Sequence, residues 1–295
     1  MYKRLESIFC GYIRVSDALP YMERGELLIR PSLAVLTEVD RAVAECIAVC
    51  IDRLALGSSA IGKVIDTGVG VDPTLEGKRV CVRPWCGLAP VERDGFAQEV
   101  ARVPEECVEA VPREVSDVDA AISMFLAVSE EQLEEITARE VLVIGRDPII
   151  LPFAMRAKKL ASRVFSVPSE TPVARHLGIE ATSITGRRSF DVVVVASLDP
   201  AVVNASLSMC RDGCVALVHP IALHLGIARP RASCRIEAIE LENLARGLRM
   251  LREARPIALK LFKFFRGLNT RALYASPALL HLSSKDDRYS KRDRK

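Results

Sequence analysis

The sequence is poor in features that mark several protein classes. It has one tryptophan, four histidines, two glutamines and three asparagines, whereas arginine, glutamate and valine are abundant. A shortage of amides beside abundant charge is typical of proteins from very hot environments, so we expect a thermophilic source. The longest apolar stretches, such as Val192 to Leu198, are far too short to cross a bilayer. The N-terminus lacks the uninterrupted apolar core of a signal peptide, so we expect a cytoplasmic protein without a membrane partner.

The cysteines lack the spacing of a metal or disulfide framework. The nine cysteines include no CxxC pair and follow no regular spacing, which argues against a zinc ribbon and a secreted disulfide scaffold. We therefore expect most of them to be small buried apolar residues. Intracellular disulfides do occur in thermophiles, which leaves a bond open among Cys46, Cys50, Cys81 and Cys86. Cys46 and Cys50 lie one helical turn apart, and the apolar face of a short helix explains this spacing better than a metal or redox pair.

The sequence contains enough apolar residues to form a sizeable core. Its 295 residues are 49% hydrophobic and 27% charged and include no repeat, as expected for a globular protein of two domains. The formal net charge is only +3, but residues 285–295 carry six basic and three acidic side chains. This segment predicts a solvated tail, and contact with a nucleic acid or an acidic partner is the alternative.

Apolar periodicity divides the chain into a β-rich part and an alternating part. From Glu26 to about Pro112, short β-rich runs alternate with glycine and proline turns, which predicts a β-barrel-like domain. Between Ser116 and Arg139 the apolar spacing is that of a helix. Beyond it, strand-like and helix-like runs alternate, so a parallel sheet wrapped by helices is the economical arrangement. The strands expected in it are 141–145, 163–167, 191–196 and 214–218.

A further helical pattern runs from Ile236 to Phe265. Leu259 to Arg271 sets apolar side chains against basic ones, as in an amphipathic helix with basic edges. We expect this helix to dock onto the β-rich part, and contact with a membrane surface or a nucleic acid is the alternative.

Five segments are recognisable by their order and spacing along the chain. They are GELLIRP (25–31), LGSSAIGKVIDTGVGV (56–71), GKRVCVRPWCG (77–87), DGFAQEVARVP (94–104) and VLVIGRDPIILPFAMRAK (141–158). Together they resemble the medium-chain dehydrogenase/reductase superfamily, especially its zinc-dependent glucose and threonine dehydrogenases. The resemblance implies an α/β protein with a GroES-like β-barrel domain, residues 1–128 with 240–295, and a trimmed Rossmann-like parallel-sheet domain, residues 129–239. The region from Ala181 to Asp191 is shorter than the family's and lacks room for a helix.

The zinc ligands that the resemblance implies are replaced in this chain. The family holds its catalytic zinc with a cysteine, a histidine beside a glutamate, and often a second glutamate. The matching positions carry Thr37, Ser58, Ser59 and Met124. Hydroxyls and a thioether hold Zn²⁺ poorly at neutral pH, so we expect no catalytic metal, and a shifted site that uses Glu38, Asp40 or Cys46 is the alternative. The family's four-cysteine structural-zinc lobe, which would begin near Cys86, is also missing.

The dinucleotide fingerprint that the resemblance implies is equally incomplete. The family's first glycine is present as Gly145, but the second and third positions are Asp147 and Ile150. Glycines are needed there because the pyrophosphate and the neighbouring strand approach the backbone closely. A carboxylate at the positive end of the helix would occupy the anion site and repel a phosphate. The acid that should contact a ribose hydroxyl is replaced by Pro168, so we expect no bound cofactor.

His219 and His224 follow a predicted strand, which suggests a proton relay or a metal pair. No carboxylate or cysteine partner lies close to them in the sequence, however. Ordinary structural or surface histidines are therefore the better interpretation.

These losses, set against an intact apolar pattern, favour a non-catalytic protein. We interpret the chain as an alcohol-dehydrogenase-like scaffold that binds a partner or copies of itself. One alternative is a zinc-independent oxidoreductase that uses NAD(P)H, and another is an RNA-associated protein that uses the basic tail. The family pairs through its cofactor domain, so we expect a homo-oligomer whose contact involves Val215 to Ile227, with Ile221 to Leu225 as its apolar part.

Overall fold

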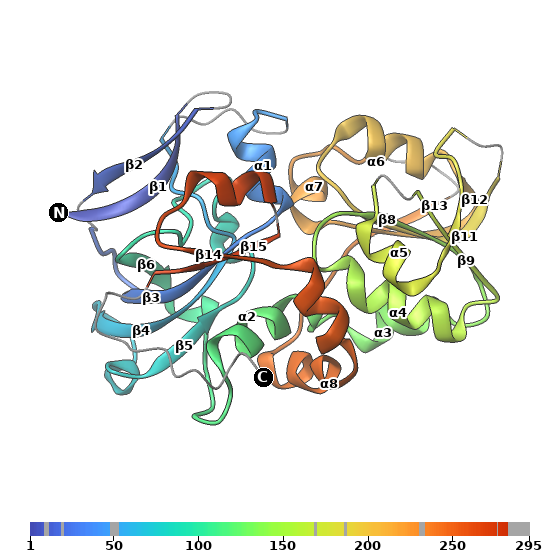
Figure 1. Ribbon diagram of the computed structural model, residues 1–295. Helices are drawn as coiled ribbons and strands as arrows, with labels where there is room; N and C mark the ends of the chain where they lie inside the picture. Colours follow the sequence, from blue (N-terminus) through green and yellow to red (C-terminus); the bar gives the residue numbers. More distant parts are fainter. Residues whose placement is uncertain are drawn as a thin grey trace.

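Two α/β units lie side by side, and the long helix α8 (Leu244–Leu261) runs where they meet (Figure 1). The computed structural model describes residues 1–8, 12–18, 21–47, 53–167, 170–185, 188–229, 234–275 and 277–282. Within these ranges, no helix combines the length and the apolar character needed to cross a membrane.

The first unit combines the N-terminal part of the chain with its C-terminal strands. Its sheet has the order β14-β15-β3-β4-β5-β7, with β6 paired to β3. The strands are β3 (Glu26–Leu36), β4 (Ser59–Thr67), β5 (Arg79–Val82), β6 (Ala101–Pro104), β7 (Val108–Ala110), β14 (Lys263–Arg266) and β15 (Ala278–His281). An antiparallel hairpin of β1 (Tyr2–Ile8) and β2 (Tyr12–Ala18) lies at the outer end of the unit (Figure 1). The sequence predicts β structure only from Glu26 to Pro112, so the hairpin and the C-terminal strands extend that prediction.

The second unit is a parallel sheet in the order β10-β9-β8-β11-β12-β13. Its strands are β8 (Glu140–Gly145), β9 (Arg163–Ser166), β10 (Glu180–Ala181), β11 (Phe190–Ala196), β12 (Cys210–Val218) and β13 (Cys234–Ala238). The order is that of a Rossmann sheet, in which the first and fourth strands are neighbours. Its helices are α4 (Ile150–Leu160), α5 (Pro172–Leu177), α6 (Pro200–Leu207) and α7 (Pro220–His224). Val192 to Val195 are fully buried in β11, as expected for a parallel strand covered on both faces.

The second sheet is trimmed, as the sequence predicts. Strand β10 has only two residues. Between β10 and β11, the residues that the structure describes, 182–185 and 188–189, form no helix. The predicted combination of a β domain with a trimmed, Rossmann-like parallel sheet is therefore observed.

Helices α2 (Asp117–Leu126) and α8 pack with their backbones in close contact. Ser116 begins α2, because its hydroxyl accepts a hydrogen bond from the N–H of Asp119 (3.1 Å). A Cβ at Gly247 in α8 would lie 1.9 Å from the carbonyl oxygen of Ser123, so only glycine permits this approach. The remaining short helices are α1 (Glu38–Ala44), α3 (Glu130–Glu134) and the 3₁₀ turns Pro73–Leu75, Cys86–Leu88, Glu105–Cys107 and Thr270–Ala275.

Three helical predictions need correction. The helix expected from Ser116 to Arg139 is divided into α2 and α3. The helix expected from Ile236 to Phe265 forms only as α8, because Ile236 belongs to β13. The amphipathic helix expected from Leu259 to Arg271 ends at Leu261, since residues 263–266 pair as β14 with β15. The partner strand lies later in the chain, so local periodicity does not reveal this pairing.

The cysteine predictions are partly wrong. Cys86 forms a disulfide with Cys107, and Cys46 is disulfide-bonded as well. Cys86 follows β5 and Cys107 precedes β7, and because these strands pair, the two thiols meet across a long sequence interval. Cys81 is a buried thiol, and burial raises its pKa to about 12, as expected for a small apolar residue. Cys50 lies outside the described residues.

The expected oligomer contact falls largely on an internal part of the second unit. Val215 to Val218 pair with β11 on one side and with β13 on the other. Ile221 and Ala222 in α7 are buried within their own chain. An edge-to-edge contact on this side of the sheet would therefore use β13 in place of residues 215–218.

Candidate functional site

The turn after β8 is where a parallel sheet of this kind holds its ligand, at the carboxyl end of the strands. Gly145 ends β8, and a Cβ there would lie 2.4 Å from the carbonyl oxygen of Ala196. The close packing of β8 against β11 therefore explains why this position requires glycine, without reference to a ligand. Its N–H donates to the carbonyl oxygen of Glu170 (3.0 Å) and to Oγ1 of Thr171 (3.2 Å). This donor is thus used within the protein.

Asp147 lies just before α4 and is fully buried. Its Oδ1 accepts a hydrogen bond from the N–H of Ile149 (3.2 Å), and its carbonyl oxygen accepts one from the N–H of Ile150 (3.1 Å). Pro148, between them, has no N–H to offer. The carboxylate therefore lies at the positive end of α4, where the first N–H groups of the helix are exposed to a bound anion in other proteins.

His219 faces Asp147 from the turn after β12. Its Nδ1 accepts a hydrogen bond from the N–H of Ile221 (3.2 Å), so the proton of the neutral ring is on Nε2. Nε2 lies 3.8 Å from Oδ2 of Asp147, and both side chains are fully buried. The ring also packs edge-on against Trp85, with 4.4 Å between the ring centroids. At 3.8 Å, Nε2 of His219 and Oδ2 of Asp147 lie beyond hydrogen-bond distance, and neither atom has another hydrogen-bond partner among the described residues.

Thr37 and Ser58 lie side by side, as the resemblance to a zinc site implies, but their hydroxyls belong to a network around Asp40. The two hydroxyl oxygens are 2.9 Å apart, and the Ser58 hydroxyl donates to Oδ2 of Asp40 (2.6 Å). The N–H groups of Thr37 (2.7 Å) and Gly57 (2.5 Å) donate to the same carboxylate. All four residues lie in the interior next to α1. Burial raises the pKa of Asp40 to about 6, against the opposing effect of these hydrogen bonds.

Asp147 couples electrostatically to α1 of the first unit. Burial raises the pKa of Glu38, the guanidinium of Arg41 opposes this, and the charge of Asp147 raises the pKa further. The charge of Asp147 likewise adds to the raised pKa of Asp40. We refer to Glu38, Asp40 and Asp147 as the interdomain acidic cluster. Its carboxylates come from both units, and it adjoins the turn where a dinucleotide would need to place its phosphates.

The other predicted site residues lie apart from this cluster. The hydroxyl of Ser59 donates to the carbonyl oxygen of Val82 (2.7 Å), and the sulfur of Met124 faces Cys81 (3.6 Å). The shifted zinc site is not supported either, because Cys46 is disulfide-bonded while Glu38 pairs with Arg41. Pro168 and the basic tail, residues 285–295, lie outside the described residues.

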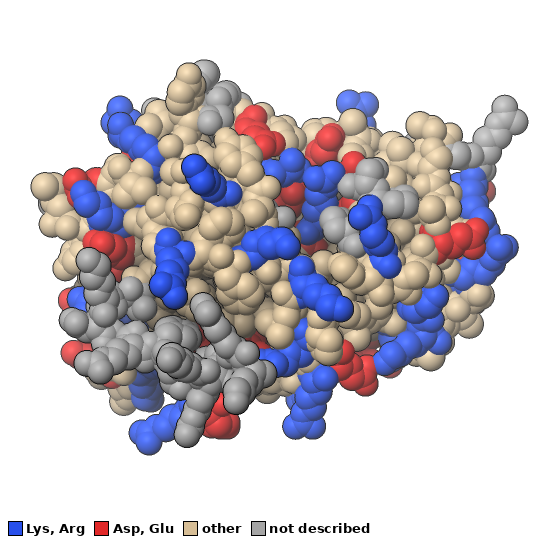
Figure 2. Space-filling model, in the orientation of Figure 1, with Lys and Arg blue, Asp and Glu red and all other residues tan. Residues whose placement is uncertain are grey.

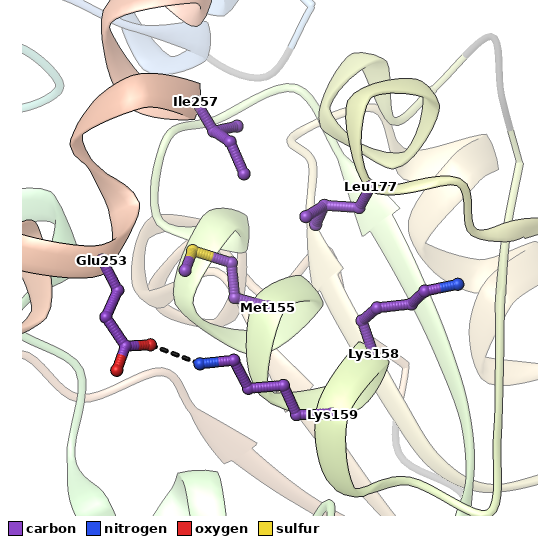
Figure 3. A pocket seen from close by; sticks show the side chains of 6 residues that line it. All are labelled: Met155, Lys158, Lys159, Leu177, Glu253 and Ile257. Atoms are coloured by element: carbon purple, nitrogen blue, oxygen red, sulfur yellow. Dashed lines mark hydrogen bonds and ion pairs between the residues drawn. The ribbon is translucent and has the colours of Figure 1, made fainter.

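A shallow pocket lies away from this site, between α4, α5 and α8 (Figure 3). Its apolar floor is formed by Met155, Leu177 and Ile257. Lys159 pairs with Glu253 at its edge, and Lys158 donates to the carbonyl oxygen of Gly178 (3.1 Å). Lys159 is thus paired with a carboxylate, and Lys158 is hydrogen-bonded to a neutral backbone carbonyl.

Comparison with solved structures identifies the fold. The zinc-dependent alcohol dehydrogenase 2 of Streptococcus pneumonia matches 97% of this chain and 100% of its own, with a TM-score of 0.68 and 16% identity. Alcohol dehydrogenase TADH of Thermus sp. ATN1 matches 95% of this chain and 100% of its own, with a TM-score of 0.63 and 17% identity. Galactitol-1-phosphate dehydrogenase of Escherichia coli matches 95% of this chain and 99% of its own, with a TM-score of 0.64 and 15% identity. The chain has the medium-chain alcohol dehydrogenase fold. No family model matches the chain, and no curated protein matches it by sequence.

The sequence analysis does not predict the contact between Asp147 and His219 that the structure shows at this site. The sequence gives His219 no carboxylate nearby, and the structure supplies one from another strand end. His224 likewise meets Glu92 of the first unit, with 2.6 Å between Nε2 and Oε1. Topology could have revealed the first pair, because Asp147 and His219 each follow a strand of the same parallel sheet and therefore share its carboxyl edge.

Proposed function

We propose that this alcohol-dehydrogenase-like protein binds neither a dinucleotide nor a catalytic zinc ion and acts as a scaffold for a partner or for copies of itself. The observation that carries the proposal is the buried carboxylate of Asp147 at the beginning of α4. A pyrophosphate in this turn would meet a like charge where the family has glycine. Two unit charges about 4 Å apart repel by about 4 kcal/mol at an effective dielectric constant of about 20.

The hydrogen bonding of the turn supports the same proposal. The N–H of Gly145 already donates to Glu170 and Thr171, and the N–H of Ile149 already donates to Asp147. A phosphate would have to break these bonds before it could accept from the same donors, and burial would strip it of water. Glu38 is paired with Arg41, which leaves Asp40 as the further carboxyl group near this turn.

The residues at the catalytic-zinc position do not fit the metal. Thr37 and Ser58 are neutral hydroxyls, which are poor ligands for Zn²⁺, and both are hydrogen-bonded within the Asp40 network. Asp40 accepts from Thr37, Gly57 and Ser58, so binding a cation would disrupt an intact set of bonds.

A scaffold role is consistent with a fold that is retained while its ligand sites are filled by side chains. We propose that copies of the chain pair through the β13 edge of the second unit. On the face shown in Figure 2, basic side chains are spread over both units and do not form one continuous patch, which does not favour a nucleic-acid groove. Salt-sensitive RNA binding that is lost when residues 285–295 are removed would instead favour an RNA-associated role.

An oxidoreductase assay tests the catalytic half of the proposal. Purified protein with NADH or NADPH and a panel of aldehydes, quinones and enones, with and without Zn²⁺, is expected to show no protein-dependent oxidation of the nucleotide. Light scattering on the same sample is expected to give the mass of a homo-oligomer. Turnover that changes in the His219→Ala variant would contradict the proposal and favour a zinc-independent oxidoreductase, because a contaminating enzyme would not respond to that substitution.

A further inference from the structure

Three cysteines of the second unit converge at the edge of the sheet opposite the acidic cluster. The Sγ atoms of Cys210, Cys214 and Cys234 all lie within 4.8 Å of one another, and those of Cys210 and Cys234 are 3.5 Å apart. Cys214 is buried, and the other two are half-buried. Cys214, within β12, is the direct register partner of Cys234, the first residue of β13. His219 follows the carboxyl end of β12, so this cluster is independent of the site described above.

An irregularity in β12 creates this convergence. Residues four apart in a regular strand lie about 13 Å apart, so Cys210 and Cys214 could not approach each other in one. The register with β11 shifts here: Phe190 pairs with Cys210, but Val192 already pairs with Val215. The extra residues bulge out of the ladder and return Cys210 to the side of Cys214. The bulge thereby brings together thiols that a regular strand would hold apart.

We propose that Cys210, Cys214 and Cys234 bind one Zn²⁺ ion through three thiolates. Thiolate ligands select soft cations such as Zn²⁺. Zn–S bonds of about 2.3 Å in tetrahedral geometry place the sulfurs roughly 3.8 Å apart, so small side-chain movements suffice to form the site. Each thiol gives up its proton to solvent on binding. The fourth position is left to a solvent molecule or to a donor from outside the cluster.

The site would join the edge strand β13 to its neighbour β12. Cys234 is the first residue of β13, and both Cys210 and Cys214 belong to β12. A bound ion would hold the beginning of the edge strand through Zn–S bonds in addition to the ladder hydrogen bonds. We therefore expect Zn²⁺ to stabilise the folded chain, because the three thiolates are brought together only there.

The test is a titration with Zn²⁺ alone and with Cd²⁺ alone of metal-free protein in which the three cluster thiols are reduced and the disulfides of Cys46 and of Cys86 with Cys107 are intact. We expect one equivalent of either ion per chain, and thiolate-to-Cd²⁺ charge-transfer absorption in the ultraviolet. Cys234→Ser is expected to lower the Zn²⁺ affinity by about 100-fold or more. Cys81→Ala, which removes a buried thiol of the first unit, is the matched control and is expected to leave the affinity unchanged.

Two results would overturn the proposal. One is binding of less than one equivalent of Zn²⁺ per chain when the three cluster thiols are reduced. A Cys210–Cys234 disulfide mapped in the protein before reduction would then assign the cluster to redox chemistry instead. The other is equal Zn²⁺ affinity in Cys234→Ser and wild type, which would place the ion elsewhere. If the variant does not fold, X-ray absorption of the wild-type zinc complex decides, since a coordination shell without three sulfurs excludes the site. Nucleotide binding plays no part in any of these outcomes.

Discussion

Replacing Gly247 by valine is expected to lower the free energy of unfolding by about 4 kcal/mol or more, or to prevent folding altogether. Gly247 lies in α8 where that helix touches the backbone of α2, and a Cβ would lie 1.9 Å from the carbonyl oxygen of Ser123. The obstacle is backbone, so no rotation of a side chain can relieve it. The two helices would have to separate, and α8 also contacts α4 and α5 of the second unit.

Urea denaturation followed by circular dichroism measures this effect. Ala245→Val is the matched control, because Ala245 is an exposed residue of the same helix. That variant carries the same β-branched side chain and is expected to lose well under about 1 kcal/mol, the cost of helix propensity alone. A Gly247→Val protein with the stability of Ala245→Val would show that the helices do not approach as closely as described.

Stability is expected to depend on the protonation of Asp40. Burial raises the pKa of its folded state to about 6 from an ordinary value of 3.8, so folding favours the protonated carboxyl. The stability that this proton contributes is fully present below pH 3.8 and is lost as the pH rises through about 6. At about 1.4 kcal/mol per pH unit, the loss is about 3 kcal/mol by neutral pH.

Urea denaturation of the wild type and of Asp40→Asn between pH 4 and 7 measures the contribution of Asp40 protonation to the free energy of unfolding, since Asn does not titrate. The wild type is expected to lose about 2 to 3 kcal/mol relative to the variant as the pH rises. Ser58→Ala removes a hydrogen bond that lowers the pKa of Asp40, so its loss of stability should be centred at a higher pH. A difference between wild type and Asp40→Asn that does not change with pH would contradict the buried carboxylate network.

Much of the fold follows from local pattern. The apolar runs at 141–145 and 191–196 are long, β-branched and bounded by turns, and they become the central strands β8 and β11. The turn at Asp147 could also be located in advance, since it directly follows such a run. Strand β14 could not be located in advance, because it is stabilised by pairing with β15, which lies later in the chain.

The contacts within the site depend on distant parts of the chain. Asp147 and His219 meet because two strands of one sheet end at the same edge, and neither residue has a local signal for the other. The thiols of Cys210, Cys214 and Cys234 converge because of a bulge that no spacing rule reveals. Sequence pattern therefore identifies which residues stand at the positions where the resembled family has its ligands, but it does not show which distant side chains contact those residues. The thermophilic source and the homo-oligomer stay predictions.

The central claim is that the carboxylate of Asp147 occupies the place of a phosphate, and calorimetric titration with NADH and NADPH tests it most directly. Trp85 contacts His219 beside this turn and is the only tryptophan, so its fluorescence reports on the same place. We expect no saturable heat and no saturable quenching of Trp85 up to about 1 mM of either nucleotide. Saturable binding with a micromolar Kd, accompanied by a change in Trp85 fluorescence, would contradict the account.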